Sequence, residues 1–204
     1  SQKTRERLNL PAWQRGGFGR LFLCFNKPSK RELHTGLSMS LDIIILAAGQ
    51  GTRMNSSTPK VLHTIAGKSM LQHVIDAARV VDDAQLHVVI GHGGEQIRNE
   101  ISGEDIRWVV QEKQLGTGHA VQQALSGLRP DAVALVLYGD VPLVNPATLK
   151  QLVLSVGADN LALLTVTLEQ PTGYGRILRG NDGFVTSIVE QKDATEEQLR
   201  IDEV

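Results

Sequence analysis

The chain has 204 residues, of which 41% are hydrophobic and 21% charged, and its formal net charge is −1. This composition is ordinary for a folded globular protein and excludes wholesale disorder, and no apolar run approaches the roughly 20 residues of a membrane-spanning helix. The near-neutral charge gives no general attraction to nucleic acid or anionic lipid, so neither is an expected partner. Because Cys24 is the one cysteine, an internal disulfide is excluded and a reducing, cytoplasmic setting is expected.

Residues 1–39 differ in character from the rest of the chain. They carry eight basic and two acidic side chains without helical or strand periodicity, and the apolar run 21–25 is too short for a secretory signal. We expect a basic tail that is disordered or not native to the protein, with Met39 as the natural start in the second case. A nucleic-acid-binding arm is the open alternative.

From residue 40 onwards, apolar runs alternate with helical patterns. The continuous apolar runs predict strands buried on both faces, at residues 42–48, 86–90, 106–110, 132–138 and 161–167. Apolar stripes at helical spacing predict helices at 69–81, 94–101, 118–128 and 146–156. This alternation predicts an α/β fold with a mostly parallel sheet and helices on both faces, in which ligands bind beyond the carboxyl ends of the strands.

The last part of the chain has a different pattern. Residues 175–178 and 184–189, joined through 180–183, predict a small antiparallel hairpin. Residues 194–200 begin a helix, and the pattern is still in progress at Val204. We therefore expect residues 40–204 to form one domain that is incomplete at its C-terminus.

A glycine-rich turn directly follows the first buried strand. In residues 46–54, Gly49 and Gly51 free the backbone for a tight turn whose N–H groups can face an anion. Arg53 and Lys60 add two cations, which suit a triphosphate whose charge must be offset during reaction. An ordinary turn with surface cations is the alternative. Neither a complete dinucleotide fingerprint nor a complete Walker A loop is present.

Two further strand ends carry polar residues. Asp140 follows the predicted strand 132–138, where a carboxylate can hold Mg²⁺ together with substrate phosphates, although a turn residue is the alternative. Gln111 closes the strand 106–110 and offers the donor and acceptor that a pyrimidine edge needs. Gly116 and Thr117 open the next helix and offer backbone donors, or serve helix entry alone.

Other catalytic chemistries find no support in the sequence. The six histidines include no pair at the helical metal-binding spacing, so a zinc site is not expected. The Gly-x-Ser-x-Gly pattern of serine hydrolases is also absent.

From about Leu41 to Val204 the chain resembles the sugar-nucleotide pyrophosphorylases, and among them the bacterial enzymes that form UDP-N-acetylglucosamine. The resemblance is carried by the strings at 46–53, 59–62, 114–120, 138–143, 171–177 and 188–195. It implies a Rossmann-like nucleotidyltransferase domain that uses Mg²⁺ to transfer UMP from UTP to N-acetylglucosamine 1-phosphate. Pyrophosphate and UDP-N-acetylglucosamine, a precursor of cell wall and lipopolysaccharide, would be the products.

The resemblance also implies what these residues would not contain. Longer members continue into a β-helix that acetylates glucosamine 1-phosphate and forms a homotrimer, so we expect the trimer only for a full-length protein. A sugar nucleotidyltransferase of another specificity and a non-catalytic nucleotide-binding fragment stay open as alternatives.

Residue roles follow from the same resemblance, position by position. Arg53 and Lys60 would be catalytic and would stabilise the phosphates, and Asp140 would hold Mg²⁺. The uridine nucleotide would be bound by Leu46, Ala47, Ala48, Gly49, Gln111, Gly116 and Thr117. The nucleotide sugar would be contacted by Tyr138, Gly139, Gly175 and Glu190.

Overall fold

The computed structural model describes residues 22–26, 40–49, 56, 58–81, 84–91, 93–101, 103–156 and 161–204. The chain divides into two compact units. One is Arg20–Val166, here called the sheet unit, and the other contains Thr167–Val204, here called the hairpin unit. None of the helices in the described ranges is long and apolar enough to cross a membrane.

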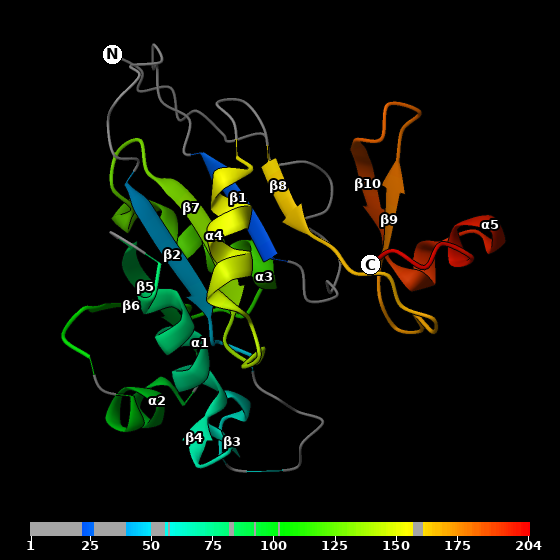
Figure 1. Ribbon diagram of the computed structural model, residues 1–204. Coiled ribbons are helices and arrows are strands. Elements are labelled where there is room, and N and C mark those ends of the chain that lie inside the picture. Colours follow the sequence, from blue (N-terminus) through cyan, green and yellow to red (C-terminus); the bar gives the residue numbers. More distant parts are fainter. Residues whose placement is uncertain are drawn as a thin grey trace, which may run out of the picture. The chain divides into compact units, whose positions relative to one another are not determined.

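A six-stranded sheet forms the centre of the sheet unit, in the order β6-β5-β2-β7-β1-β8 (Figure 1). The four parallel strands are β6 (Ile106–Val110), β5 (Ala84–Ile90), β2 (Leu41–Leu46) and β7 (Val133–Tyr138). β1 (Phe22–Asn26) is antiparallel to both β7 and β8 (Leu161–Leu164). The α/β fold with a mostly parallel sheet, predicted from the apolar runs, is confirmed.

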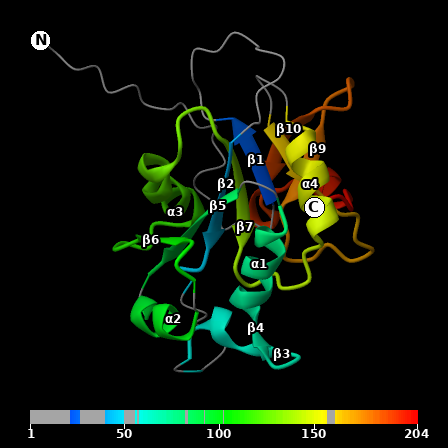
Figure 2. The ribbon, with the colours of Figure 1, turned by 60° about the vertical axis from the view of Figure 1, so that its left-hand side comes forward.

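Helices cover both faces of the sheet. Successive residues of each strand point to opposite sides, and in the central strands the apolar side chains on both sides are buried beneath helices. Ile43 and Ile45 of β2 face one apolar cluster and Ile44 faces another, and all three are fully buried. The first cluster takes residues from α1 (Met70–Arg79), α2 (Gly94–Glu100) and α4 (Pro146–Leu154). The second takes residues from α3 (Thr117–Ala124), which lies on the other side of the sheet (Figure 2).

The helices begin at residues that suit a helix N-terminus. The Ser69 side chain accepts a hydrogen bond from the Gln72 backbone N–H at 3.2 Å, which caps α1. Asn145 caps α4 in the same way, and Pro146 occupies its first turn, where its missing N–H is no loss. The sequence did not predict the short elements η3 (Lys60–Leu62), β3 (Thr64–Ile65) and β4 (Lys68–Ser69), whereas the predicted helix at 118–128 covers α3 and the 3₁₀ turn η4 (Leu125–Gly127).

The hairpin unit contains the antiparallel pair β9 (Arg176–Arg179) and β10 (Val185–Val189), as predicted. A 3₁₀ turn, η5 (Gln191–Asp193), follows, and α5 (Glu196–Leu199) begins at a capping box formed by Thr195 and Gln198. The Ile177 backbone N–H donates to the Glu203 carbonyl oxygen at 3.0 Å. The last residues of the chain are therefore hydrogen-bonded to the first strand of this hairpin.

Strand β1 lies in a segment for which the sequence pattern predicts no regular element. It pairs Leu23 with Val136 of β7 and with Leu163 of β8. The apolar run is five residues long, which is enough for a strand when neighbours on both sides complete its hydrogen bonds. The other residues of 1–39 lie outside the described part of the chain, so the basic-tail prediction stays a prediction for them.

Candidate functional site

The carboxyl ends of β2 and β7 mark the point where the order of the strands reverses. After β2 the chain builds β5 and then β6 on one side, and it returns to form β7 on the other side of β2. Leu46 and Tyr138, the last residues of β2 and β7, are direct neighbours in the register. In open α/β sheets ligands bind at this switch point, so the segments that follow these strands form the candidate site.

Backbone pairing continues past the strand ends into these segments. The Ala47 N–H donates to the Val89 oxygen at 2.8 Å, and the Gly139 N–H donates to the Leu46 oxygen at 2.9 Å. A side chain at Gly139 would place its Cβ 3.1 Å from Leu71 Cδ1 and 3.2 Å from the Leu46 oxygen. Glycine suits this position because the neighbouring strand end and α1 approach closely.

Two of the predicted site residues meet in an ion pair. Lys60 begins η3, and its Nζ donates to Asp140 Oδ2 at 2.6 Å. The two side chains are 30% and 20% exposed, so the pair is partly shielded from water. The third predicted charge, Arg53, lies outside the described residues, as does Gly51 of the glycine-rich turn.

The carboxylate of Asp140 is suited to a shared metal ion. Among the described residues no group of three or more His, Cys, Asp or Glu side chains could hold a metal ion without other ligands. Mg²⁺ is commonly bound by one or two carboxylates, with substrate phosphates and water as its other ligands. One aspartate at this strand end fits such an ion, provided that the substrate supplies phosphate oxygens.

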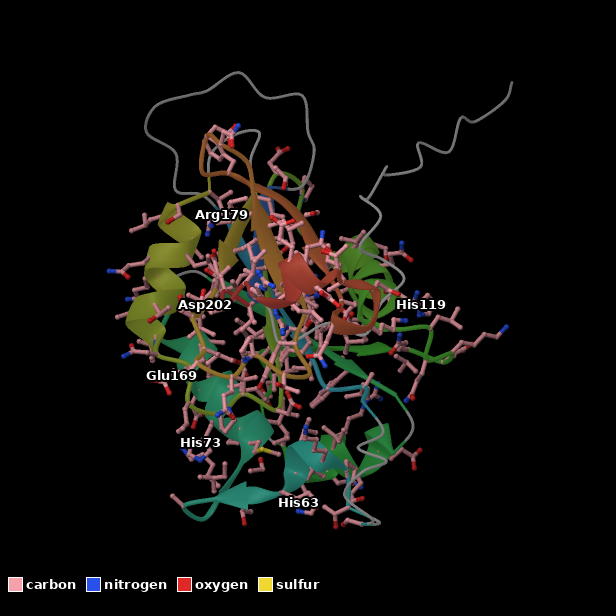
Figure 3. All side chains as sticks on the ribbon, turned by 90° about the vertical axis from the view of Figure 1, so that its right-hand side faces the viewer. His63, His73, His119, Glu169, Arg179 and Asp202 are labelled. Carbon is pink, nitrogen blue, oxygen red and sulfur yellow. The ribbon has the colours of Figure 1, made fainter. Side chains whose placement is uncertain are left out.

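The predicted base-recognition residues lie together between β6 and α3. Gln111 is 4% exposed, and its Nε2 donates to the Gly116 carbonyl oxygen at 3.1 Å. Gly116 precedes α3 with a φ of 98°, a left-handed conformation that glycine adopts readily, and Thr117 is the first helical residue. The Gln111 amide also lies 3.0 Å from Nδ1 of His119, which is labelled on α3 in Figure 3. The sequence-based reasoning missed His119, although it lies inside the family string at 114–120.

Gln114 and Gly91 were also missed. The Gln114 side chain donates from Nε2 to the Ala48 carbonyl oxygen at 2.7 Å, which ties the segment after β6 to the turn after β2. A Cβ at Gly91 would lie 2.7 Å from that same Nε2. The glycine-rich sequence at 91–94 is typical of a flexible loop. In the structure, Gly91 leaves the space that the Gln114 side chain occupies.

Gly175 and Glu190 belong to the hairpin unit. Gly175 is buried, and a Cβ there would lie 3.2 Å from Ile188 Cγ2. Oε1 of Glu190 is buried and has no hydrogen-bond partner among the described residues. Burial raises the pKa of the Glu190 carboxyl above its ordinary value, and the nearby Lys192 opposes this effect.

Similarity to known proteins agrees with this geometry. Residues 43–180 match the model of the MobA-like NTP transferase domain. The bifunctional protein GlmU of Pseudomonas entomophila is 61% identical over 165 residues, which are 81% of this chain and 36% of that protein. GlmU of Stutzerimonas stutzeri is 59% identical over the same shares of the two chains. The chain thus spans about a third of the length of the curated relatives that it matches.

Solved structures share the fold. The Mycobacterium tuberculosis protein Rv0371c is 27% identical, with a TM-score of 0.52 over 58% of this chain and 61% of its own. A UDP-glucose pyrophosphorylase complexed with UDP-glucose is 17% identical, with a TM-score of 0.63 over 81% of this chain and 74% of its own. The family match runs from β2 into the hairpin and includes the switch point with Lys60 and Asp140. The chain belongs to the MobA-like NTP transferase family.

Proposed function

We propose that the chain transfers UMP from UTP to N-acetylglucosamine 1-phosphate, as the uridyltransferase part of a longer protein. The observation that carries this proposal is the Lys60–Asp140 pair at the switch point where β2 and β7 end. The identity of 61% to a GlmU protein and the family strings in the sequence support the choice of sugar nucleotide.

The proposed reaction needs no activated side chain. An oxygen of the sugar phosphate, already ionised, bonds to the α-phosphorus of UTP, and the bond from that phosphorus to the bridging oxygen breaks. The leaving group is pyrophosphate. Because both reactants are anions, the protein must position them and neutralise their charge. Lys60 supplies one positive charge at the strand end, and Arg53 is proposed to supply another.

Asp140 is proposed to hold a divalent metal ion, with Mg²⁺ as the expected one. The ion would neutralise and orient the phosphates of the bound nucleotide. The manganese complex reported for Rv0371c, a structural neighbour, supports a divalent ion in this fold. The Lys60 ammonium group lies 2.6 Å from the Asp140 carboxylate. Its flexible side chain can turn its N–H donors to phosphate oxygens by rotation about its own bonds.

The substrate-binding roles are proposed from the same resemblance. Leu46, Ala47, Ala48 and Gly49 would line the uridine nucleotide, with Gln111, Gly116 and Thr117 at the base. Tyr138, Gly139, Gly175 and Glu190 stay predictions for the sugar. We propose UTP and N-acetylglucosamine 1-phosphate as substrates and UDP-N-acetylglucosamine as product.

The test measures pyrophosphate release from UTP and N-acetylglucosamine 1-phosphate with Mg²⁺. It uses the 204-residue chain and a chimera in which residues 40–204 replace the matching segment of the Pseudomonas entomophila relative. We expect release by the chimera and its loss in Asp140→Ala. Asp76→Ala is the matched control, because Asp76 pairs with Lys68 at 2.5 Å on the surface of α1.

Three outcomes would contradict the proposal in different ways. If the chimera released no pyrophosphate while the parent relative did, the proposed activity would be rejected. If the chimera bound UTP without turnover, the chain would be a nucleotide-binding module and not an enzyme of this kind. Equal use of GTP and UTP in a panel of four nucleoside triphosphates would reject Gln111 as the reader of a pyrimidine.

A further inference from the structure

We propose that His119 is a positioning residue that makes Gln111 select uracil over cytosine. The inference rests on the proposed function, in which Gln111 contacts the nucleobase. It concerns the orientation of the Gln111 side-chain amide. This amide can present either its oxygen or its NH₂ group to a ligand, and the two choices favour different pyrimidines.

The Gly116 carbonyl fixes which end of the Gln111 amide faces α3. A carbonyl oxygen only accepts hydrogen bonds, so the amide atom 3.1 Å from it must be the donor Nε2. The same oxygen also accepts from the Ala120 backbone N–H at 3.1 Å. Reversing the amide would place Oε1 against this oxygen, and repulsion between the two acceptors in a buried setting disfavours that orientation.

His119 takes up the second hydrogen of the same NH₂ group. Its Nδ1 lies 3.0 Å from Gln111 Nε2 and must act as the acceptor, so the hydrogen of the neutral ring is on Nε2. On its other side the ring places Nε2 3.2 Å from Nε2 of Gln123, one helical turn further along α3. The contact that orients the Gln111 amide is therefore the one at Nδ1 of His119.

With both hydrogens of Gln111 engaged, its Oε1 is the polar atom left to face a ligand. No hydrogen bond to Oε1 is made within the described part of the chain. Uracil carries a hydrogen at N3 and can donate it to this oxygen, whereas N3 of cytosine is an acceptor and would be repelled. Without an acceptor at residue 119, the amide would be held in its orientation by Gly116 alone.

The test compares UTP and CTP dissociation constants, measured by calorimetry with Mg²⁺ on the complete 204-residue chain. His119→Leu removes the acceptor, and we expect the preference for UTP over CTP to fall about tenfold. His119→Asn keeps an acceptor near the position of Nδ1 and should restore the preference. His73→Asn is the control, since His73 lies on α1 and bonds the Ile65 carbonyl oxygen.

The outcomes separate the inference from the function on which it rests. A His119→Leu variant that keeps the preference, or weakens UTP and CTP equally, overturns the positioning role. If that variant fails to fold, His119→Ala removes the same acceptor, and an unchanged preference there overturns the role as well. By contrast, if Gln111→Leu binds UTP as the parent chain does, the proposed base reader itself is wrong. The probe 3-methyl-UTP, which lacks the N3 hydrogen, should bind more weakly than UTP only while Gln111 is present.

Discussion

Lys60 Nζ lies 2.6 Å from Asp140 Oδ2, although 80 positions separate the two residues in the sequence. The pair joins the segment after β2 to the segment after β7, the two strands between which the sheet order reverses. A metal ion that binds Asp140 must compete with the ammonium group for the carboxylate. The two side chains can therefore be tested separately, by their effects on metal dependence and on turnover.

Asp140→Asn keeps the shape of the side chain and removes its charge. We expect turnover by the chimera to fall by about 10²–10³-fold, with a higher Mg²⁺ concentration needed for half-maximal pyrophosphate release. A magnesium titration measures both effects. Asp76→Asn should change neither, since Asp76 pairs with Lys68 at the surface. An unchanged magnesium titration in Asp140→Asn would remove this residue from the metal site.

Lys60→Met removes the cation and keeps most of the side-chain length. We expect turnover to fall by about 10²–10³-fold, because one charge on the phosphates is no longer offset. The free energy of unfolding should change by only about 0–1 kcal/mol, as for other partly exposed ion pairs. Urea unfolding and pyrophosphate release measure the two quantities. Lys68→Met in the Lys68–Asp76 pair should show the small stability effect and full turnover.

Asp42→Ala should strongly destabilise the sheet unit. Asp42 is fully buried, and its oxygens accept from the Arg129 backbone N–H at 2.6 Å and from Arg129 Nε at 2.8 Å. The Arg129 side chain is 30% exposed, so the loss is that of hydrogen bonds to a charged group, about 1.5–3 kcal/mol. Urea unfolding measures the change. Asp105→Ala, in an exposed pair with Arg79, should cost far less, and equal losses would contradict the role given to burial.

Stability should fall at mildly acidic pH because of His87. Burial lowers the pKa of this fully buried ring below its ordinary value, and the Asp42 carboxylate at 3.9 Å opposes that effect. The unfolded chain therefore binds a proton that the folded chain does not, and stability is lost as the pH falls below the unfolded pKa of about 6.5. His87→Leu should flatten the curve of unfolding free energy between pH 7.5 and 5. His73→Leu should leave the slope unchanged. If His87→Leu also kept the slope of the parent chain, His87 would not be the cause of the loss of stability at acidic pH.

Glu190→Gln should stabilise the chain near neutral pH. Burial raises the pKa of Glu190, so the folded state binds a proton that the unfolded state releases. Stability from this group is present below the unfolded pKa of 4.5 and is lost as the pH rises through the folded pKa. We expect a gain in the free energy of unfolding at pH 7 and little gain at pH 4, measured by urea unfolding. Glu169→Gln, at an exposed position (Figure 3), should show no such difference.

Much of the fold could be predicted because burial leaves a regular pattern in the sequence. The apolar run of β2 and the helical stripe of α1 indicate their type and approximate bounds without any tertiary information. Strand β1 could not be predicted in this way. It is short and lies in a basic segment, and its partners β7 and β8 follow it by more than a hundred residues.

The candidate site was predictable where motif and strand end coincide. Lys60 and Asp140 were predicted to share a ligand, and the topology brings them together. The role of His119 was not predictable, because it depends on how the segment after β6 places Gln111 against the first turn of α3. The contact of Gln114 with Ala48 is missed for the same reason, since side-chain contacts between loops leave no periodic signal.

The backbone hydrogen bonds of Ala47, Gln111 and Gly139 extend the sheet by one residue beyond β2, β6 and β7. Those amide protons are consequently anchored to the most deeply buried strands and should exchange with deuterium on the timescale of global unfolding. The backbone at these three positions would then already be ordered before a nucleotide binds, so binding would cost little conformational entropy there. Adaptation to the ligand would fall to rotatable side chains such as Lys60.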